Sequence, residues 1–277
     1  MTFSGAVSVL ETRNLGNRNH LMFLKAPEVA AIIQPAQFVM LSLQHGTEPL
    51  LGRPFSVAQI GQGPGGPTLG LLFKVVGRAT QILSQLNPGA RLGLVGPLGQ
   101  PFPAPGETDA PVFLVAGGIG IAPFPILAMR LHQQGFRTHL LYGARTRSDL
   151  VARDLFSMSC SEISVATEDG SEGFRGFISH LLGQVLDGLP RSREHRPLAY
   201  ACGPPPMLAA TDAVLGRRHV SGHLCVESFM ACGFGVCLSC VVAIREPGKK
   251  TAAYRRVCVD GPSFPTGSIV WPRSKPR

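Results

Sequence analysis

Four cysteines near the C-terminus have a spacing that suits an iron–sulfur cluster. Three of them follow one another as C-x4-C-x2-C, and the fourth comes after an interval of hairpin length. Because four thiolates must converge on one small volume, the loop between them needs small residues, and Gly233, Gly235 and Ser239 meet that need. We therefore predict a [2Fe–2S] centre whose ligands are Cys232, Cys237, Cys240 and Cys258.

Zinc, disulfides and simple burial are the alternative interpretations of these thiols. Structural zinc favours paired C-x2-C knuckles, and only Cys237 and Cys240 form one, so zinc is the weaker alternative. An odd total of seven cysteines, with no segment resembling a signal peptide, disfavours disulfides. Cys225 lies in an alternating stretch typical of a strand and Cys160 fits no ligand pattern, so we interpret both as packing residues.

Length, charge and hydropathy exclude several classes of protein. The 277 residues, 44% of them hydrophobic, suffice for two domains and a small module. The formal net charge is +9, but aromatic residues make up 7%, so a solvated basic surface or an acidic protein partner is a better interpretation than nucleic-acid binding. The uncharged stretch 110–129 has the length of a membrane span, yet prolines and glycines interrupt it. We expect a cytoplasmic protein with no membrane span, in which the thiols stay reduced.

The first part of the chain predicts a closed antiparallel β-barrel. Short runs of alternating apolar and polar residues recur six times between Gly and Pro turns, and only Thr80–Leu86 has a helical pattern. We assign residues 1–99 to this barrel and Gln100–Ala110 to a linker. The strands are predicted at Ala6–Thr12, His20–Lys25, Phe38–Gln44, Phe55–Ile60, Leu69–Val76 and Arg91–Val95.

From Pro111 onward the pattern alternates between strands and helices, which indicates a doubly wound parallel α/β domain over residues 100–220. The remaining residues, 221–277, are predicted to form a small cluster module in which a hairpin of Val241–Arg245 and Tyr254–Val259 returns Cys258 to the other cysteines. The fold class is thus α/β plus β. In the α/β domain we predict strands at Val112–Ala116, Thr138–Tyr142, Ile163–Ala166 and Leu198–Ala201, and helices at Pro123–Gln134, Ser148–Met158, Gly176–Leu186 and Pro204–Arg217.

Two stretches of the predicted barrel could bind a flavin. An arginine can fork onto a pyrophosphate and a serine hydroxyl can bond a ring nitrogen, and one tetrapeptide holds both groups. A second stretch leads from a strand into the barrel helix, whose N-terminus is suited to phosphate. The candidate residues are Arg53, Pro54, Phe55 and Ser56 in the first stretch and Leu72, Phe73, Lys74, Ala79 and Thr80 in the second.

Two glycine turns of the α/β domain could bind a nicotinamide nucleotide. Each follows a strand and precedes a helix, so both should open at the carboxyl edge of one sheet, where ligands bind in such folds. A thiol in the second turn would offer a soft, uncharged wall beside a nicotinamide ring. The candidate residues are Gly117, Gly118 and Gly120 in the first turn and Cys202 and Gly203 in the second.

The three predicted sites are consistent with one another in electron count. NADH gives two electrons as a hydride, whereas an iron–sulfur cluster accepts one at a time. A flavin can do both, so a chain with nucleotide loops and a cluster requires a flavin between them. The predicted cofactors are FAD, a [2Fe–2S] cluster and NAD.

With these residues identified, the chain resembles the ferredoxin reductase superfamily and, within it, the electron-transfer subunits of class B dihydroorotate dehydrogenase. The resemblance covers nearly the full length, and its most specific parts are Glu227–Cys240 and the pattern Cys258-x-Asp260-Gly261-Pro262-x-Phe264. It implies that FAD lies at residues 53–56, 72–74 and 79–80 and that the four cysteines hold the cluster. It also implies a partner: an FMN-containing catalytic subunit that oxidises dihydroorotate in pyrimidine biosynthesis, within a heterotetramer.

Two other functions stay open. A similar chain could serve a hydrogenase or a transhydrogenase as its electron-input subunit, or could sense redox state without turnover. The sequence also leaves NADH and NADPH as alternatives, since Arg145 and Arg147 follow the second strand of the sheet and could receive a 2′-phosphate.

Overall fold

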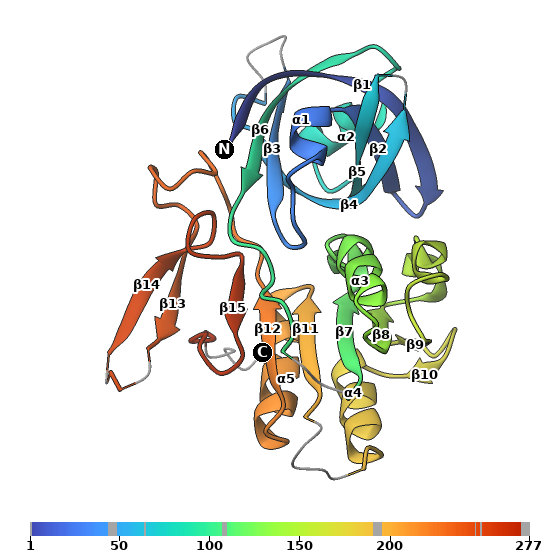
Figure 1. Cartoon of the computed structure of the whole chain (residues 1–277), viewed down its shortest axis with the longest axis vertical. Coiled ribbons are helices and arrows are strands. Elements are labelled where there is room, and N and C mark those ends of the chain that lie inside the picture. Colours follow the sequence, from blue (N-terminus) through green and yellow to red (C-terminus); the bar gives the residue numbers. More distant parts are fainter. Residues whose placement is uncertain are drawn as a thin grey trace.

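The computed structural model describes residues 2–43, 49–63, 65–106, 110–190, 196–246, 248–249 and 251–272. Gln44 of one predicted strand, residues 107–109 of the predicted linker, and Pro247 and Lys250 of the hairpin tip lie outside this part of the chain. In Figure 1 the barrel lies above a twisted sheet, and the last strands of the chain lie beside both. No helix among the described residues is long and apolar enough to cross a membrane.

The predicted barrel is confirmed. Its six strands close in the order β1-β2-β5-β4-β3-β6, with antiparallel pairs throughout. Inward-facing side chains such as Met22, Leu69 and Leu92 are fully buried, as the alternating pattern requires. The strands are β1 (Phe3–Gly16), β2 (Asn19–Lys25), β3 (Phe38–Leu43), β4 (Arg53–Gly63), β5 (Gly66–Lys74) and β6 (Arg91–Leu98).

The expectation of a single helix in the barrel is wrong. The predicted helix is present as α2 (Arg78–Ser84), but one turn, α1 (Pro27–Ala30), also forms. Pro27 stands at its first position, where a missing N–H costs nothing, and Val29 and Ala30 are buried in the barrel core. A four-residue helix is too short to show the 3.6-residue period on which the prediction depended.

The second sheet confirms the doubly wound parallel fold. Its order is β10-β9-β8-β7-β11-β12-β15, and the six strands from β10 to β12 run parallel. Helix α3 packs in one buried cluster, whereas α4 and α5 pack in another, so helices cover both faces. The elements are β7 (Val112–Gly117), α3 (Phe124–Gln133), β8 (Thr138–Ala144), β9 (Glu162–Thr167), β10 (Phe174–Arg175), α4 (Ile178–Asp187), β11 (Leu198–Cys202), α5 (Pro205–Arg217) and β12 (Ser221–Cys225).

The helix predicted at Ser148–Met158 is wrong. Two short 3-10 turns, η2 (Arg147–Asp149) and η3 (Arg153–Phe156), occupy this stretch, and Ala152 between them has a left-handed φ of 58°. The buried Tyr142 hydroxyl donates to the carbonyl of Asp149 and accepts from the N–H of Val151. A side chain from β8 thus takes the backbone groups that a continuous helix would have needed.

The tail is joined to the second sheet. Strand β12, which the sequence places in the cluster module, pairs with β11, and β15 (Ser263–Pro265) pairs with β12 in the antiparallel sense. The predicted hairpin is present as β13 (Val241–Arg245) and β14 (Ala252–Arg256), although residues 257–260 form a turn instead of strand.

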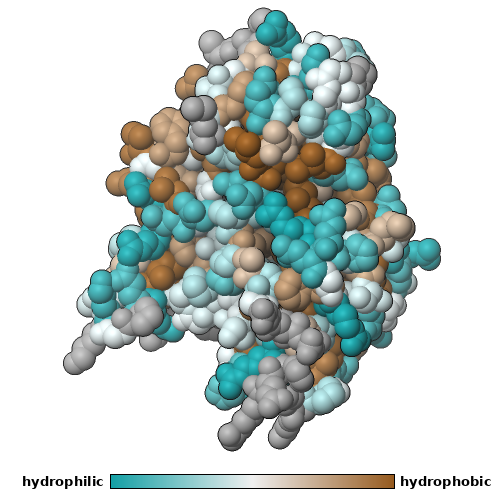
Figure 2. Space-filling model, viewed as in Figure 1, coloured by the Kyte–Doolittle hydropathy of each residue, from teal (hydrophilic) through white to brown (hydrophobic). Residues whose placement is uncertain are grey.

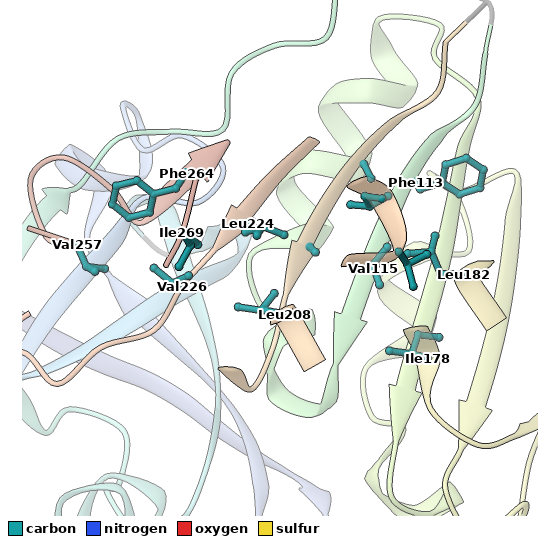
Figure 3. Close-up of a cluster of buried hydrophobic side chains, with 14 of the residues drawn as sticks. Phe113, Val115, Ile178, Leu182, Leu208, Leu224, Val226, Val257, Phe264 and Ile269 are labelled. Carbon is teal, nitrogen blue, oxygen red and sulfur yellow. The ribbon is translucent and has the colours of Figure 1, made fainter. Parts of the chain in front are cut away.

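One continuous core explains this arrangement. Figure 3 shows the cluster of buried side chains extending from Phe113 and Leu182 in the α/β domain through Leu224 to Val257 and Phe264 in the tail. The division of the chain into domains at residues 99 and 220 stays a prediction. The boundary at residue 220 falls just before β12, a strand that pairs with β11 of the α/β sheet.

Candidate flavin, nucleotide and cluster sites

A cavity of about 410 Å³ lies between the barrel and the carboxyl ends of β11 and β12. This volume is typical of a site for a small molecule or cofactor. Ten of the predicted cofactor residues line it, although they come from four separate segments of the chain: Arg53, Pro54, Phe55, Ser56, Leu72, Phe73, Lys74, Ala79, Thr80 and Cys202.

The barrel side of the cavity is held by local hydrogen bonds. Nη1 of Arg53 donates to the carbonyls of Leu51 and Gly52 at 2.6 and 3.2 Å, which orients the guanidinium at the rim. The Thr80 hydroxyl accepts from the N–H groups of Val76 and Gly77 at 3.0 and 3.2 Å. Thr80 therefore caps the first turn of α2 and shapes the loop that borders the cavity.

Lys74 connects the cavity to the second sheet, a role that sequence reasoning missed. Its Nζ lies 2.7 Å from Oδ1 of Asp149, which also accepts from Nδ2 of Asn17 at 2.6 Å. Asp149 lies in η2 after β8, so this carboxylate joins the barrel to the α/β domain. No local sequence pattern could have indicated the ion pair of Lys74 and Asp149, because the two residues are 75 positions apart.

The predicted glycines of the nucleotide loops lie beside the cavity and not in its lining; Ile119, between them, does line it. In the structure these glycines allow the two loops to approach each other closely. A Cβ on Gly120 would lie 2.5 Å from the carbonyl oxygen of Cys202, and a Cβ on Gly117 would lie 2.3 Å from the sulfur of Met207. The contact of Gly120 is with backbone atoms, so the loops after β7 and β11 pack this closely because Gly120 carries no side chain.

Two adjacent thiols and a carboxyl group form the floor of the cavity. Cys202 and Cys225 are in register on β11 and β12, both are buried, and both line the cavity together with Glu227. A hydrogen bond with Cys225, followed by burial, raises the pKa of Cys202 well above its ordinary value. The Glu227 side chain opens into the cavity, but the protein around it displaces solvent and raises the pKa of this carboxyl group too. Sequence reasoning treated Cys225 as packing and did not select Glu227.

The four predicted cluster ligands are arranged as two pairs. The Cys237 N–H donates to Sγ of Cys232 at 3.5 Å, while Cys240 and Cys258 are both buried and in contact. Among the residues that the structure describes, no three His, Cys, Asp or Glu side chains gather closely enough for a single metal ion. Two pairs of thiols fit a two-iron cluster, in which each iron takes two cysteines, better than one tetrahedral zinc.

The two pairs differ in their surroundings. A hydrogen bond between its sulfur and the Ser239 hydroxyl, at 3.1 Å, is the main reason that the pKa of Cys237 falls to about 6. Burial is the main cause that raises the pKa of Cys258 to about 12. A cluster bound here would therefore have one exposed and one buried side.

Glycines permit the conformation of the cysteine loop. Gly233 and Gly235 have φ of 82° and 88°, which only glycine adopts readily. A Cβ on Gly233 would lie 2.5 Å from Cγ of Met40 in β3, so the loop packs directly on the barrel.

The cysteine loop also begins at the cavity wall. Met230 lines the cavity and is two residues from Cys232, so their Cα atoms are within about 7 Å of each other. Pro262 lines the cavity from the other arm of the tail, after Cys258. The predicted flavin and cluster sites are therefore neighbours.

Two family models match the chain. Residues 227–270 match the iron–sulfur cluster binding domain of dihydroorotate dehydrogenase B, and residues 114–213 match the oxidoreductase NAD-binding domain. Among solved structures, an NADH-dependent reduced ferredoxin-NADP oxidoreductase aligns with a TM-score of 0.80 and 28% identity, covering 98% of this chain and 92% of its own. A ferredoxin reductase of carbazole 1,9a-dioxygenase aligns with a TM-score of 0.65 and 27% identity over 79% of this chain and 67% of its own.

Barrel, nucleotide sheet and cysteine loop together define an NAD-linked flavin and iron–sulfur oxidoreductase subunit with the ferredoxin reductase architecture. Curated relatives narrow the class further. The electron transfer subunits of dihydroorotate dehydrogenase B (NAD(+)) from Desulforamulus reducens and Geobacillus thermodenitrificans are each 35% identical to this chain, over 95% of its length and 97% of theirs. The chain belongs to this family of electron transfer subunits.

Proposed function

We propose that this chain carries electrons from the flavin of a partner subunit, through a [2Fe–2S] cluster and FAD, to NAD⁺. The partner would be the FMN-containing catalytic subunit that oxidises dihydroorotate in pyrimidine biosynthesis. The single observation that carries this proposal is the cavity itself, because barrel residues, the thiols of the nucleotide sheet and the start of the cysteine loop share its walls. A cytoplasmic location would keep the thiols reduced.

We assign the barrel wall of the cavity to the flavin. When bound there, FAD would exchange electron pairs with the nucleotide and single electrons with the cluster. Arg53 lies at the rim, where its guanidinium can pair with pyrophosphate, while Ser56 and Leu72–Lys74 line the space left for the ring system. Phe38, Phe55 and Phe73 give this wall an apolar surface that excludes water.

We assign the opposite wall to the nicotinamide. Cys202 keeps its proton at neutral pH because its pKa is raised, so it presents no charge to a hydride in transfer. Glu227, a carboxyl group whose pKa is also raised by burial, lines the cavity together with these thiols. The backbone of Gly117–Gly120 lies at the carboxyl end of β7, where nucleotides bind in such sheets.

The partner surface, in this proposal, surrounds the cysteine loop. Phe229, Phe234, Val236 and Leu238 are all large, apolar and more than half exposed. Figure 2 shows hydrophobic side chains at the left edge of the molecule, over this loop. Contiguous exposed apolar side chains are typical of an interaction site, and a partner docked here would lie against the exposed side of the cluster. We propose a heterotetramer with two copies of each subunit.

Co-expression with the FMN subunit of the same host tests the proposal. The complex should contain FMN, FAD and iron, and should reduce NAD⁺ when given dihydroorotate, whereas the FMN subunit alone should not. A complex that holds all three cofactors yet does not oxidise dihydroorotate would contradict the pathway assignment and leave the route through the chain intact.

A second function has one observation in its favour. The NADH-dependent reduced ferredoxin-NADP oxidoreductase covers nearly the whole chain with a TM-score of 0.80. The same subunit design could therefore serve as the NADH-linked input of a larger redox complex. Purification of the native complex distinguishes the two: nickel or a second nicotinamide site in place of FMN would favour this alternative. A sensor without turnover would show no rapid bleaching of its flavin when mixed with NADH.

A further inference from the structure

The carboxyl ends of β8 and β9 form the edge of the sheet that lies beyond the cavity. A nucleotide with its nicotinamide at Cys202 must extend from β11 across β7, because on the other side β12 leads directly into the cysteine loop. The next strands in that direction are β8 and β9. The adenosine half would therefore lie over the loops 145–149 and 168–173, because ligands bind at this edge of parallel sheets.

These loops carry a charge arrangement that neither the family models nor the names of the relatives describe. The Glu172 carboxylate is shared between two arginines: Oε2 lies 3.4 Å from Nε of Arg147, and both oxygens pair with the guanidinium of Arg153. The Glu172 side chain is 26% exposed and that of Arg153 is 35% exposed, so water only partly screens this pair, whereas the Arg147 side chain is 74% exposed.

Hydrogen bonds hold together the two loops that carry Arg147 and Glu172. The Ser171 hydroxyl accepts from the backbone N–H of Arg147 at 2.8 Å and donates to the Asp169 carboxylate at 2.7 Å. The backbone N–H of Glu172 donates to the Thr167 hydroxyl at 3.0 Å, which ties the loop to the end of β9. The backbone of Arg147 is thereby held against the loop that carries Glu172, and Nε of Arg147 lies 3.4 Å from the Glu172 carboxylate.

We propose that Glu172 is the residue that makes this chain select NADH over NADPH. This inference rests on the proposed function, because it names the nucleotide that the same site accepts. The two nucleotides differ by a 2′-phosphate, a dianionic group at neutral pH that proteins recognise with unpaired arginines. Here Arg147 and Arg153 are already paired, and the incoming phosphate would also meet the negative charge of Glu172. A ribose hydroxyl group carries no charge and meets no such barrier.

Glu172 is thus a positioning residue that acts through Arg147. Replacement of Glu172 by Gln removes the charge, keeps the size of the side chain and leaves two arginines at the edge of the sheet. Affinity for a 2′-phosphate should then rise, while affinity for a nucleotide without it should change little. A purely structural role for Glu172 would instead weaken both.

The direct test compares the binding of 5′-AMP and 2′,5′-ADP to the full chain by protein NMR titration. These fragments carry the adenosine half alone, so the readout does not depend on flavin reduction. E172Q should raise the affinity for 2′,5′-ADP relative to 5′-AMP about tenfold, as expected for one additional charge-assisted contact. The ratio of kcat/KM for NADPH to that for NADH should move in the same direction.

Two further variants make the result specific. D187N is the matched control, because Asp187 also holds an arginine, Arg218, by two hydrogen bonds, but at the end of α4. It should leave the ratio unchanged. E172Q/R147A should lose the gain of E172Q.

The outcomes separate this inference from the proposed function. If E172Q binds 5′-AMP normally and gains nothing for 2′,5′-ADP, or if D187N gives the same gain, the inference is overturned. If the wild-type chain binds neither fragment at the ends of β8 and β9, the nucleotide site of the proposed function is overturned with it.

Discussion

The two groups of cysteines show how one residue type acquires opposite chemistry. Cys202 and Cys225 are buried and lie opposite each other on adjacent strands. A hydrogen bond with Cys225, followed by burial, raises the pKa of Cys202, so this thiol stays protonated. Cys237 lies in a glycine-containing loop, is exposed, and receives hydrogen bonds that lower its pKa to about 6. Strands thus provide a neutral wall, whereas the loop provides a thiolate that could serve as an anionic ligand.

The largest expected effect is on metal content. C240S and C258S should each abolish the cluster, because both residues belong to one pair and the loss of either leaves an iron with a single thiolate. C225S should keep the cluster, since Cys225 lies on the cavity floor. Iron and sulfide analysis with paramagnetic resonance after dithionite reduction distinguishes them. If C225S lost as much iron as C258S, the cysteines of the cavity floor could not be distinguished from the predicted cluster ligands.

The next effect concerns thiol reactivity in the cluster-free, reduced chain. At pH 7 a thiol with a pKa of about 6 is about nine-tenths thiolate, whereas one with a pKa above 9 is less than about one-hundredth thiolate. Iodoacetamide should therefore label Cys237 at least about 100-fold faster than the buried Cys202. The Cys237 rate should decline as the pH falls through about 6. Peptide mass analysis over a pH series measures both rates, and equal labelling would contradict the contrast.

A smaller effect tests the packing of the loop on the barrel. G233A adds a Cβ at a positive φ and against Met40, so it should lower the free energy of unfolding by about 1–3 kcal/mol. G248A is the matched control, because Gly248 has a φ of 77° and, among the described residues other than its chain neighbours, no atom lies within 4 Å of an added Cβ; it should cost about 1 kcal/mol. Fluorescence of Trp271, the single tryptophan, follows unfolding in denaturant. Equal losses would mean that the contact with Met40 contributes nothing.

Sequence reasoning identified the barrel strands, and predicted the cysteine ligands, from signals that are local. Alternation predicted the barrel strands to within a few residues, and the spacing of Cys232 to Cys240 is a property of nine consecutive positions. The barrel segments were also chosen well enough that all nine of their candidate residues line one cavity.

What the sequence could not show depends on distant partners. Asp149 and Glu172 acquire their roles through lysine and arginines that other elements bring near, and Glu227 becomes a cavity residue because β12 joins the sheet. The helix predicted at Ser148–Met158 was lost to hydrogen bonds from Tyr142, a side chain of the preceding strand. Tertiary contacts of this kind override local propensity.

The most direct test of the account is an anaerobic NADH titration of the full chain loaded with FAD and cluster, followed by visible absorbance and paramagnetic resonance together. Because the cavity wall and the cysteine loop are neighbours, we predict that the flavin band bleaches and that the signal of a reduced [2Fe–2S] cluster then appears in the same sample. A flavin that bleaches fully while the cluster stays oxidised, although dithionite can reduce it, would contradict the account.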